Sequence, residues 1–394
     1  MGLIETLPGP SSGPWLDQGD GLRVLIAHDW LVTWAGSERC VEQMLRLFPR
    51  ADVLVGVRDP GLRENNAVTR KAVETWLGRL PGVRSHHRWF LPIQGLAFAS
   101  VDTAGYDVVL SSSHAFSKMI RTRPDTPHVC YCHSPPRYLW DLHETYRRRG
   151  SGAERVALAL GGPLLRWMDR RSARGVDRFI ANSRYVAARI RRIYGRSAVV
   201  VYPPVVRKAG PGVTGPRADF LLSLGRLVPY KRVDLAIAAA ERLGTRLVVA
   251  GDGPDRTRLE RMAGPHTEFL GEVTELEAGH LLSSCTALVF CAEEDFGITP
   301  VEANAHGAPV VAFGAGGVCE SMIEGETAEF APRQTVADMA AAIERACTRS
   351  WDPAVLAQNA SRFAPEAFRA GVLSVVTGAL QRGSEELLSA EGSP

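Results

Sequence analysis

Short apolar runs recur along this chain, and each is followed by a glycine-containing or polar turn and then by a segment of helical period. The run 22–27 has the pattern of a buried strand, and apolar residues between Glu38 and Phe48 recur at helical spacing. Strands of this kind that alternate with helices are typical of a parallel sheet with helices on both faces. The chain is therefore expected to adopt a doubly wound α/β fold.

The alternation occurs in two series. Strands are predicted over 22–27, 51–57, 106–111, 128–132, 178–182 and 198–202, then over 220–224, 246–250, 267–270, 287–291 and 309–313. Helices are predicted in the second series over 234–243, 256–263, 275–283, 300–306 and 336–347. A single core seldom grows beyond about 250 to 300 residues, so a chain of 394 residues is expected to form two domains.

Composition shifts set the domain boundaries. The glycine- and proline-rich stretch 207–218 has little to bury and is predicted to be a linker. It separates an N-terminal domain over 21–206 from a C-terminal domain over 219–365, and a helix over 366–382 is expected to pack back on the N-terminal domain. Residues 1–20 and 383–394 are predicted to be a disordered leader and tail.

The charge distribution is uneven although the formal net charge is only +3. Residues 121–196 hold 17 arginines, no lysine and 6 acidic residues, whereas the rest of the chain is acidic on balance. The whole chain therefore does not have the character of a nucleic-acid binder. Seven cysteines without metal-ligand spacing do not suggest a disulfide framework, so we expect a cytoplasmic protein.

Two cations follow the first strand of the second series. In the run Gly225–Lys231, Arg226 can grip a diphosphate with its planar fork, and Lys231 can add a point charge. Two solvated surface cations at a strand end would leave the same pattern. Glycine turns at Gly251 and Gly271 end the next two strands, and the backbone of Glu272 and Val273 could contact a base, although plain structural turns explain these positions equally well.

The segment 294–302 carries two glutamates, Glu294 and Glu302, on either side of a predicted helix start. Gly297 allows close approach of a ligand to the backbone, and free N–H groups at a helix N-terminus favour anions. Glu302 could hold the vicinal hydroxyls of a ribose, with Glu294 on the sugar side. A solvated acidic loop is the alternative reading.

Taken in order, these motifs resemble the family-4 retaining glycosyltransferases of the GT-B fold. The resemblance covers about residues 219–345 and implies two Rossmann-like domains that face each other across a cleft. It implies that Arg226 and Lys231 bind the donor diphosphate, Glu302 the ribose, and Glu294 the transferred sugar. Its donor-binding set in this chain comprises Gly36, Gly225, Arg226, Lys231, Gly251, Gly271, Glu272, Val273, Glu294, Phe296, Gly297, Ile298 and Glu302.

The N-terminal half resembles the same family, with one departure. The first loop keeps a single glycine, Gly36, where many members have a pair, which weakens the expectation that the diphosphate approaches it. His114 at a strand end matches the histidine that contacts the donor sugar, and the resemblance places it with Arg226, Lys231 and Glu294 among the catalytic residues.

Further runs are similar to bacterial GDP-mannose-dependent mannosyltransferases of polysaccharide assembly. This similarity implies a GDP-linked mannose or deoxyhexose as donor and a glycan or polyprenyl-linked saccharide as acceptor. Candidate acceptor-binding residues are His28, Asp29, Trp30, His133 and Arg137, although a packing role for His133 and Arg137 is equally open.

No cofactor or metal is expected. The sequence has no Asp-x-Asp run, and Arg226 and Lys231 could stabilise the leaving diphosphate in place of a metal. We expect retention by a front-face route in which the leaving phosphate accepts the acceptor's proton. A glycoside hydrolase that uses Glu294 and Glu302 would leave both cations without a role.

Three alternatives remain within the fold: a UDP-sugar transferase acting on a small molecule or glycolipid, a catalytically silent nucleotide-sugar-binding subunit, and an epimerase that needs no acceptor. The arginine-rich stretch 147–171, interleaved with apolar residues, predicts a helical hairpin that docks on an anionic membrane surface, with 86–91 as a second contact; an ordinary packed helix is equally open. Such docking would make the protein peripheral on the inner face of the plasma membrane.

Overall fold

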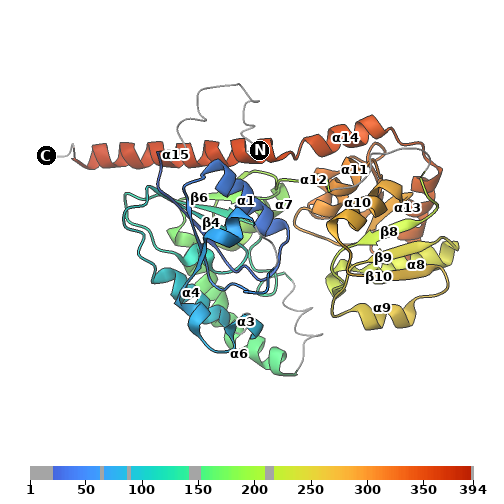
Figure 1. The fold of residues 1–394 in the computed structure, drawn as a ribbon, viewed down its shortest axis with the longest axis horizontal. Helices are drawn as coiled ribbons and strands as arrows, with labels where there is room; N and C mark the ends of the chain where they lie inside the picture. The colour runs from blue at the N-terminus through green and yellow to red at the C-terminus, as the bar shows by residue number, and fades with distance from the viewer. Residues whose placement is uncertain (1–20, 63–65, 87–89, 142–151, 209–216, 392–394) are drawn as a thin grey trace. The chain divides into compact units, whose positions relative to one another are not determined.

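A computed structural model describes residues 21–62, 66–86, 90–141, 152–208 and 217–391 (Figure 1). These residues form two compact units. The first unit contains the described residues up to 181, together with 189–201 and those from 368 onward; the second contains 182–188 and the described part of 202–367. The predicted leader and residues 209–216 of the predicted linker lie outside the described residues.

The first unit is built on a seven-stranded parallel sheet with the order β3-β2-β1-β4-β5-β6-β7. The strands are β1 (Val24–His28), β2 (Asp52–Val55), β3 (Ala72–Glu74), β4 (Val108–Ser113), β5 (His128–Cys132), β6 (Arg178–Ala181) and β7 (Ala198–Val200). Successive residues of β1 enter different cores: Val24 and Ile26 join one apolar cluster, and Leu25 and Ala27 join another. The sheet is therefore covered on both faces, which explains the absence of polar alternation.

The helices of the first unit connect these strands. They are α1 (Gly36–Leu47), α2 (Ala67–Lys71), α3 (Val83–His86), α4 (Leu91–Ala99), α6 (Gly152–Ser172) and α7 (Arg184–Tyr194), of which residues 184–188 belong to the second unit. On α1, Val41, Met44 and Leu45 are spaced three and four residues apart and lie in the core, as the helical period predicts.

The last helix, α15 (Pro365–Glu391), completes the core of the first unit. Phe368, Val372 and Val376 are buried in the same cluster as the β1 side chains, and the Phe368 ring lies 5.3 Å from that of Tyr131 on β5. A disordered tail was predicted from residue 383, whereas the structure continues α15 through 383–391; residues 392–394 lie outside the described residues. No glycine or proline interrupts this stretch beyond Gly383, so the helix can extend.

The second unit has a six-stranded parallel sheet with the order β10-β9-β8-β11-β12-β13. Its strands are β8 (Leu221–Leu224), β9 (Leu247–Ala250), β10 (Thr267–Gly271), β11 (Ala287–Phe290), β12 (Val310–Phe313) and β13 (Ala328–Ala331). Its helices are α8 (Val233–Leu243), α9 (Arg256–Met262), α10 (Glu275–Ser284), α11 (Ile298–Ala305), α12 (Val318–Ser321), α13 (Val336–Thr348) and α14 (Pro353–Ser361).

The second sheet is also covered on both faces, since Leu222 and Leu288 join one apolar cluster and Leu221 and Val289 join the other. In both sheets the order of strands reverses beside the first strand of the unit, β1 or β8. Open α/β sheets bind their ligands outside the carboxyl ends of the strands at such a reversal. The doubly wound prediction is confirmed for both halves; the sequence reading missed only the edge strands β3 and β13 and several helices.

Candidate functional site

The loop after β8 places the two predicted diphosphate ligands at the carboxyl end of the second sheet. Arg226 is exposed, and its guanidinium makes no hydrogen bond or ion pair with any residue that the structure describes. Lys231, at the end of a short 3-10 turn, forms an ion pair with Glu294, and its ammonium lies 5.8 Å from the centroid of the Phe290 ring. Gly225, Arg226 and Lys231 line one small pocket together with the end of β11.

Close backbone packing explains the glycines of the next two loops. Gly251 donates its N–H to Gly271 O at 2.6 Å, and Gly225 donates to Ala250 O at 2.9 Å. A Cβ added at Gly251 would overlap the carbonyl oxygen of Gly225, and one at Gly253 would overlap that of Leu227. The glycines therefore hold the ends of β8, β9 and β10 together; Glu272 and Val273 follow β10, with Glu272 exposed.

The Glu294 loop is fixed by neighbours on several segments. Gly317 donates its N–H to Glu294 O at 2.8 Å, and a Cβ at Gly317 would overlap the backbone of Asp295. Ser183 donates its hydroxyl to Asp295 O at 2.5 Å, and Tyr185 donates its hydroxyl to Glu293 at 2.9 Å. The loop therefore presents the Glu294 carboxylate in a set position beside Lys231.

The residues that follow Glu294 in the sequence differ in which of their groups a ligand could contact. The Phe296 ring is buried between Tyr202 and Phe363, so only its backbone is left for a ligand. Gly297, with a φ of 84°, lies in the left-handed region and precedes Ile298, the first residue of α11. Glu302 is buried on α11, and its carboxylate accepts from the Lys208 ammonium at 3.0 Å.

Asp29 of the first unit has a structural task that the sequence reading missed. Its fully buried carboxylate accepts four backbone N–H groups at 2.6 to 2.8 Å, from His114, Ala115, Phe116 and Ser117. Burial favours the neutral form of Asp29, but the charge of His114 and these hydrogen bonds outweigh it and lower the pKa. Asp29 therefore shapes the loop after β4 and is not available to contact an acceptor.

His28 is likewise buried within the unit. Its ring bonds to the Ser112 backbone and hydroxyl at 3.2 and 3.1 Å through Nδ1, and to Glu38 at 3.3 Å through Nε2. Burial opposes the charge on His28, but Glu38 raises its pKa, and His28 lowers the pKa of Glu38 against burial in return. His28 therefore connects the α1 start, next to Gly36, to β4, and is not an acceptor ligand in this structure.

His114 is the predicted catalytic residue of the first unit, and its side chain is 26% exposed. Its Nδ1 lies 3.4 Å from Asp29 Oδ2, and its ring packs edge-on to Trp30 at 4.4 Å between centroids. Burial lowers the pKa of His114 although Asp29 acts in the opposite direction. When His114 is neutral and its Nδ1 faces Asp29, Nε2 can accept a hydrogen bond from a sugar hydroxyl.

His133 and Arg137 lie in the turn after β5. His133 Nε2 is 2.8 Å from the Ser112 hydroxyl, and burial, together with the positive charges of His114 and His28, lowers its pKa to about 3. Its ring lies 6.1 Å from that of His114. Trp30, His114 and His133 thus form one group at the carboxyl end of the first sheet, with Arg137 half-buried nearby in sequence.

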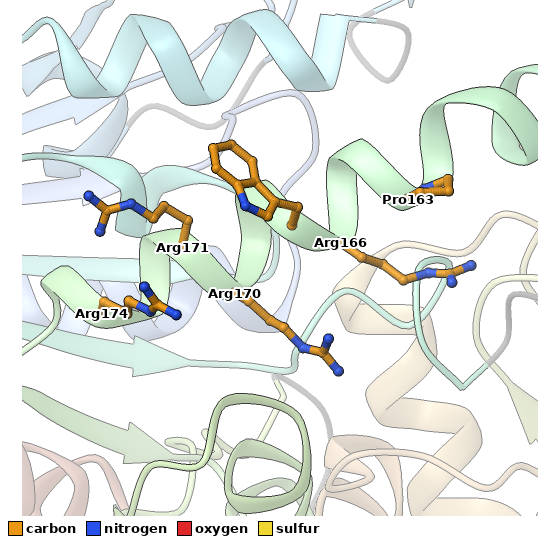
Figure 2. Close-up of a pocket in the computed structure, with 6 residues that line it drawn as sticks. Pro163, Arg166, Arg170, Arg171 and Arg174 are labelled. Carbon is orange, nitrogen blue, oxygen red and sulfur yellow. The ribbon is translucent and has the colours of Figure 1, made fainter.

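The basic stretch forms one helix where a hairpin was predicted: α6 runs unbroken from Gly152 to Ser172, with Pro163 inside it. Arg147 to Arg149 and residues 87–89 lie outside the described residues. Three arginines of its C-terminal part and one from the 3-10 turn Ala173–Gly175, with Pro163 and Trp167, line an open groove of about 350 Å³. Figure 2 shows the side chains that line it. The arginines are Arg166, Arg170, Arg171 and Arg174.

This arginine groove is anchored from inside the unit. Asp169 is fully buried on α6 and accepts from Lys118 at 2.7 Å, from Trp140 at 2.8 Å and from Tyr194 at 3.0 Å. On the outer side, Leu164 and Trp167 are 56% and 62% exposed. Within the described part of the chain, no helix is long and apolar enough to span a bilayer.

Sequence reasoning missed the residues that position the predicted ligands. These residues are far in sequence from the groups that they contact. Ser183 is 112 positions from Asp295, Tyr185 is 108 positions from Glu293, and Lys208 is 94 positions from Glu302. A single sequence carries no signal for such pairs.

Two family models match the chain. Residues 34–208 match Glycosyltransferase Family 4, and residues 213–363 match Glycosyl transferases group 1. Glycogen synthase of Mycobacterium tuberculosis is 38% identical over 141 residues, which cover 33% of this chain and 34% of that protein. A GDP-mannose-dependent alpha-(1-6)-phosphatidylinositol monomannoside mannosyltransferase of Mycolicibacterium smegmatis is 29% identical over 224 residues, 45% of this chain and 57% of the relative.

These matches span between one third and just over half of the curated relatives' own length. The similarity in fold to solved structures covers more of the chain. Sucrose-phosphate synthase from Thermosynechococcus elongatus superposes with a TM-score of 0.63 at 19% identity, covering 93% of this chain and all of that one.

Proposed function

Because the chain belongs to the glycosyltransferases of the GT-B fold, with a Family 4 half followed by a group 1 half, we propose that it transfers a hexose from a nucleotide sugar to a saccharide hydroxyl with retention of configuration. The observation that carries the proposal is the convergence of Arg226, Lys231 and Glu294 at the strand reversal of the second sheet.

Each of these groups meets a need of the reaction. When the anomeric carbon–oxygen bond breaks, its electron pair stays on the diphosphate, where the Arg226 guanidinium and the Lys231 ammonium stabilise the charge. The acceptor oxygen bonds to the anomeric carbon on the same face, and its proton passes to the leaving phosphate oxygen. Glu294 holds the hydroxyls of the transferred sugar. For His114, the family resemblance implies the role of a donor-sugar contact.

The donor is proposed to be GDP-linked mannose or a deoxyhexose, with a glycan or lipid-linked saccharide as acceptor. The GDP-mannose-dependent relative from Mycolicibacterium smegmatis supports this choice. A UDP-sugar is the second candidate, because a glycogen synthase, whose name does not mention GDP-mannose, is also similar to this chain. Presence of Arg226, Lys231 and Glu294 argues against a silent nucleotide-binding subunit.

Calorimetry with GDP, UDP and ADP tests the donor directly. We expect one nucleotide to bind at least about tenfold more tightly than the others, and a Lys231→Met variant to lose most of that affinity, since the diphosphate would lose a cation. If none of the three binds the wild type, the proposed function is wrong. Release of sugar nucleotide products without acceptor would favour an epimerase.

No metal is proposed to take part, because two protein cations already face the diphosphate site. Dialysis against EDTA is expected to leave the transfer rate unchanged. A rate that falls and returns on addition of Mg²⁺ would show that Arg226 and Lys231 do not suffice to stabilise the leaving group.

The arginine groove on α6 is proposed to hold the protein on an anionic lipid surface, where a lipid-linked acceptor would be found. Its four arginines make no ion pair with any residue that the structure describes, and Leu164 and Trp167 expose apolar surface beside them. Cations flanking exposed aromatic and aliphatic side chains suit the interface of an anionic bilayer.

Flotation with vesicles of anionic or neutral lipid tests this docking. The wild type is expected to float only with anionic vesicles and to be released at high salt. The double variant Arg171→Ser/Arg174→Ser should lose most of this binding, whereas Arg242→Ser/Arg261→Ser, with the same loss of charge on exposed helix positions of the second unit, should retain it. If both double variants lose vesicle binding equally, the net charge of the protein, and not the arginine groove, causes the binding.

A further inference from the structure

Lysine is rare in this chain, and its positions are informative. The sequence contains four lysines, Lys71, Lys118, Lys208 and Lys231. Two of them form ion pairs with the two glutamates of the 294–302 segment: Lys231 with Glu294, and Lys208 with Glu302. The family resemblance assigns Lys231, whereas nothing assigns Lys208.

Lys208 is held against α11 by the segment that leads to it. Val205 donates its N–H to Phe363 O at 2.8 Å, and Arg207 donates from Nε to Ala305 O, the last residue of α11, at 3.1 Å. The Lys208 ammonium then lies 3.0 Å from Glu302 Oε1, with side-chain exposures of 14% and 6% for the two residues. The pair is therefore shielded from solvent and salt.

Several cationic side chains lie near this end of α11. The charges of Arg207, Lys208 and Arg217, in addition to its burial, lower the pKa of His306 at the end of α11 to about 4. Arg217 itself donates to four backbone carbonyl oxygens near this end of the helix. Glu302 therefore lies among several cationic side chains, and a neutral ligand group must compete with Lys208 for its carboxylate.

The two lysine–glutamate pairs respond differently to a nucleotide. A diphosphate brings negative charge to Lys231, so the loss of its pairing with Glu294 is offset by a new ionic contact. A ribose brings only neutral hydroxyls to Glu302. Hydrogen bonds from a charged donor are roughly twice as strong as those from a neutral one, so the ribose does not replace the ammonium without a cost.

We propose that Lys208 is an internal competitor for the ribose: it occupies Glu302 while the donor site is empty and leaves the carboxylate when a nucleotide binds. This inference rests on the proposed function, in that Glu302 is taken as the ribose ligand. It adds that nucleotide affinity is reduced by the pairing, as for any protein whose competent state is only partly populated. It also makes the segment 202–208 respond to the donor.

Removal of the competing cation gives the first test. In calorimetry with the nucleotide that binds the wild type, Lys208→Met is expected to bind about three- to tenfold more tightly. Lys208→Arg, which can restore the pair, should bind like the wild type or more weakly. Arg242→Met is the control, because it removes one positive charge at an exposed position of the same unit, away from Glu302, and it should change the affinity less than twofold.

Acylation of lysines in the unmodified protein gives the second test and does not depend on a variant that folds. With limiting acetic anhydride and mass spectrometry, Lys208 is expected to react several-fold faster when nucleotide is present, and Lys231 several-fold slower because phosphate covers it. Exposed Lys71 and buried Lys118 serve as internal references for high and low reactivity.

The outcomes separate this inference from the proposed function. If nucleotide binds and slows acylation of Lys231, but Lys208 becomes less reactive or Lys208→Met binds more weakly, then Lys208 is a nucleotide ligand and the competitor role is overturned. Unchanged reactivity and unchanged affinity would also overturn it. If no nucleotide protects Lys231, the proposed function itself has failed.

Discussion

The two units hold their carboxylates in different ways. In the first unit, Asp29 and Glu38 are buried and their oxygens bind backbone N–H groups and histidine rings. In the second unit, Glu294 and Glu302 each contact a lysine ammonium at the carboxyl end of the sheet. An ammonium on a flexible stem can move away, whereas a set of backbone amides cannot. The carboxylates of the first unit therefore fix the conformation of a loop, whereas those of the second unit can exchange a lysine for a ligand.

The largest expected effect comes from Asp29→Ala in the first unit. Four buried N–H groups would lose their acceptor, so we expect a loss of about 3 kcal/mol or more in the free energy of unfolding measured with urea. Asp252→Ala is the counterpart in the second unit, where an exposed carboxylate accepts the N–H of Gly253 at 2.6 Å. It should cost less than about 1 kcal/mol. If the two variants lose similar free energies of unfolding, the buried carboxylate of the first unit contributes no more to stability than the exposed one of the second.

Lys231→Met should act on the reaction and leave the fold intact. Loss of a cation that stabilises the leaving diphosphate is expected to lower kcat by roughly 10²- to 10³-fold, with an unchanged melting temperature. Lys71→Met is the control. Lys71 lies on α2, outside the site, and donates to the backbone oxygens of Pro49 and Ala51. A turnover within threefold of the wild type would contradict the role assigned to Lys231.

Glu302→Gln and Glu294→Gln should divide binding from chemistry. Glu302→Gln is expected to raise the nucleotide Kd about tenfold with a small change in kcat, because the amide is a weaker acceptor for ribose hydroxyls. Glu294→Gln should lower kcat more than it raises Kd. The reverse pattern would mean that the two glutamates exchange their roles.

The smallest expected effect is on pH dependence. Burial lowers the pKa of His128 to about 4 and, with nearby positive charges, that of His133 to about 3, against 6.5 when unfolded. Below pH 6.5 the unfolded chain then binds more protons than the folded chain. The free energy of unfolding therefore decreases as the pH is lowered, by at most about 1.4 kcal/mol per histidine and pH unit. His28, whose pKa is raised, acts in the opposite direction. Urea unfolding at pH 7.5 and 5.5 should show a net loss, which His133→Asn reduces.

Much of the architecture was readable from the sequence because strands buried on both faces lack polar alternation. Leu222 and Leu221 enter opposite cores of one sheet, which explains the continuous apolar runs. The edge strands β3 and β13 were missed because they are short and only partly apolar; β3 has no fully buried residue. Edge strands pack on fewer neighbours, so their sequence is less constrained.

The candidate site was only partly readable. The family resemblance gave Lys231 and Glu294 as donor ligands, and in the structure these two side chains form an ion pair. The role of Asp29 was not predictable from its neighbours, because the N–H groups that it binds lie 85 or more positions away. Close neighbours in space that are distant in sequence leave no trace in local patterns.

The burial of α15 side chains among those of β1 and β5 has a consequence for biosynthesis. Phe368, Val372 and Val376 supply part of the first unit's core, yet they are translated after every strand of both sheets. A ribosome-bound chain can therefore complete the second unit's core while the first still exposes apolar surface. A premature stop before residue 368 would therefore remove part of the apolar core of the first unit, although all strands of that unit had been synthesised.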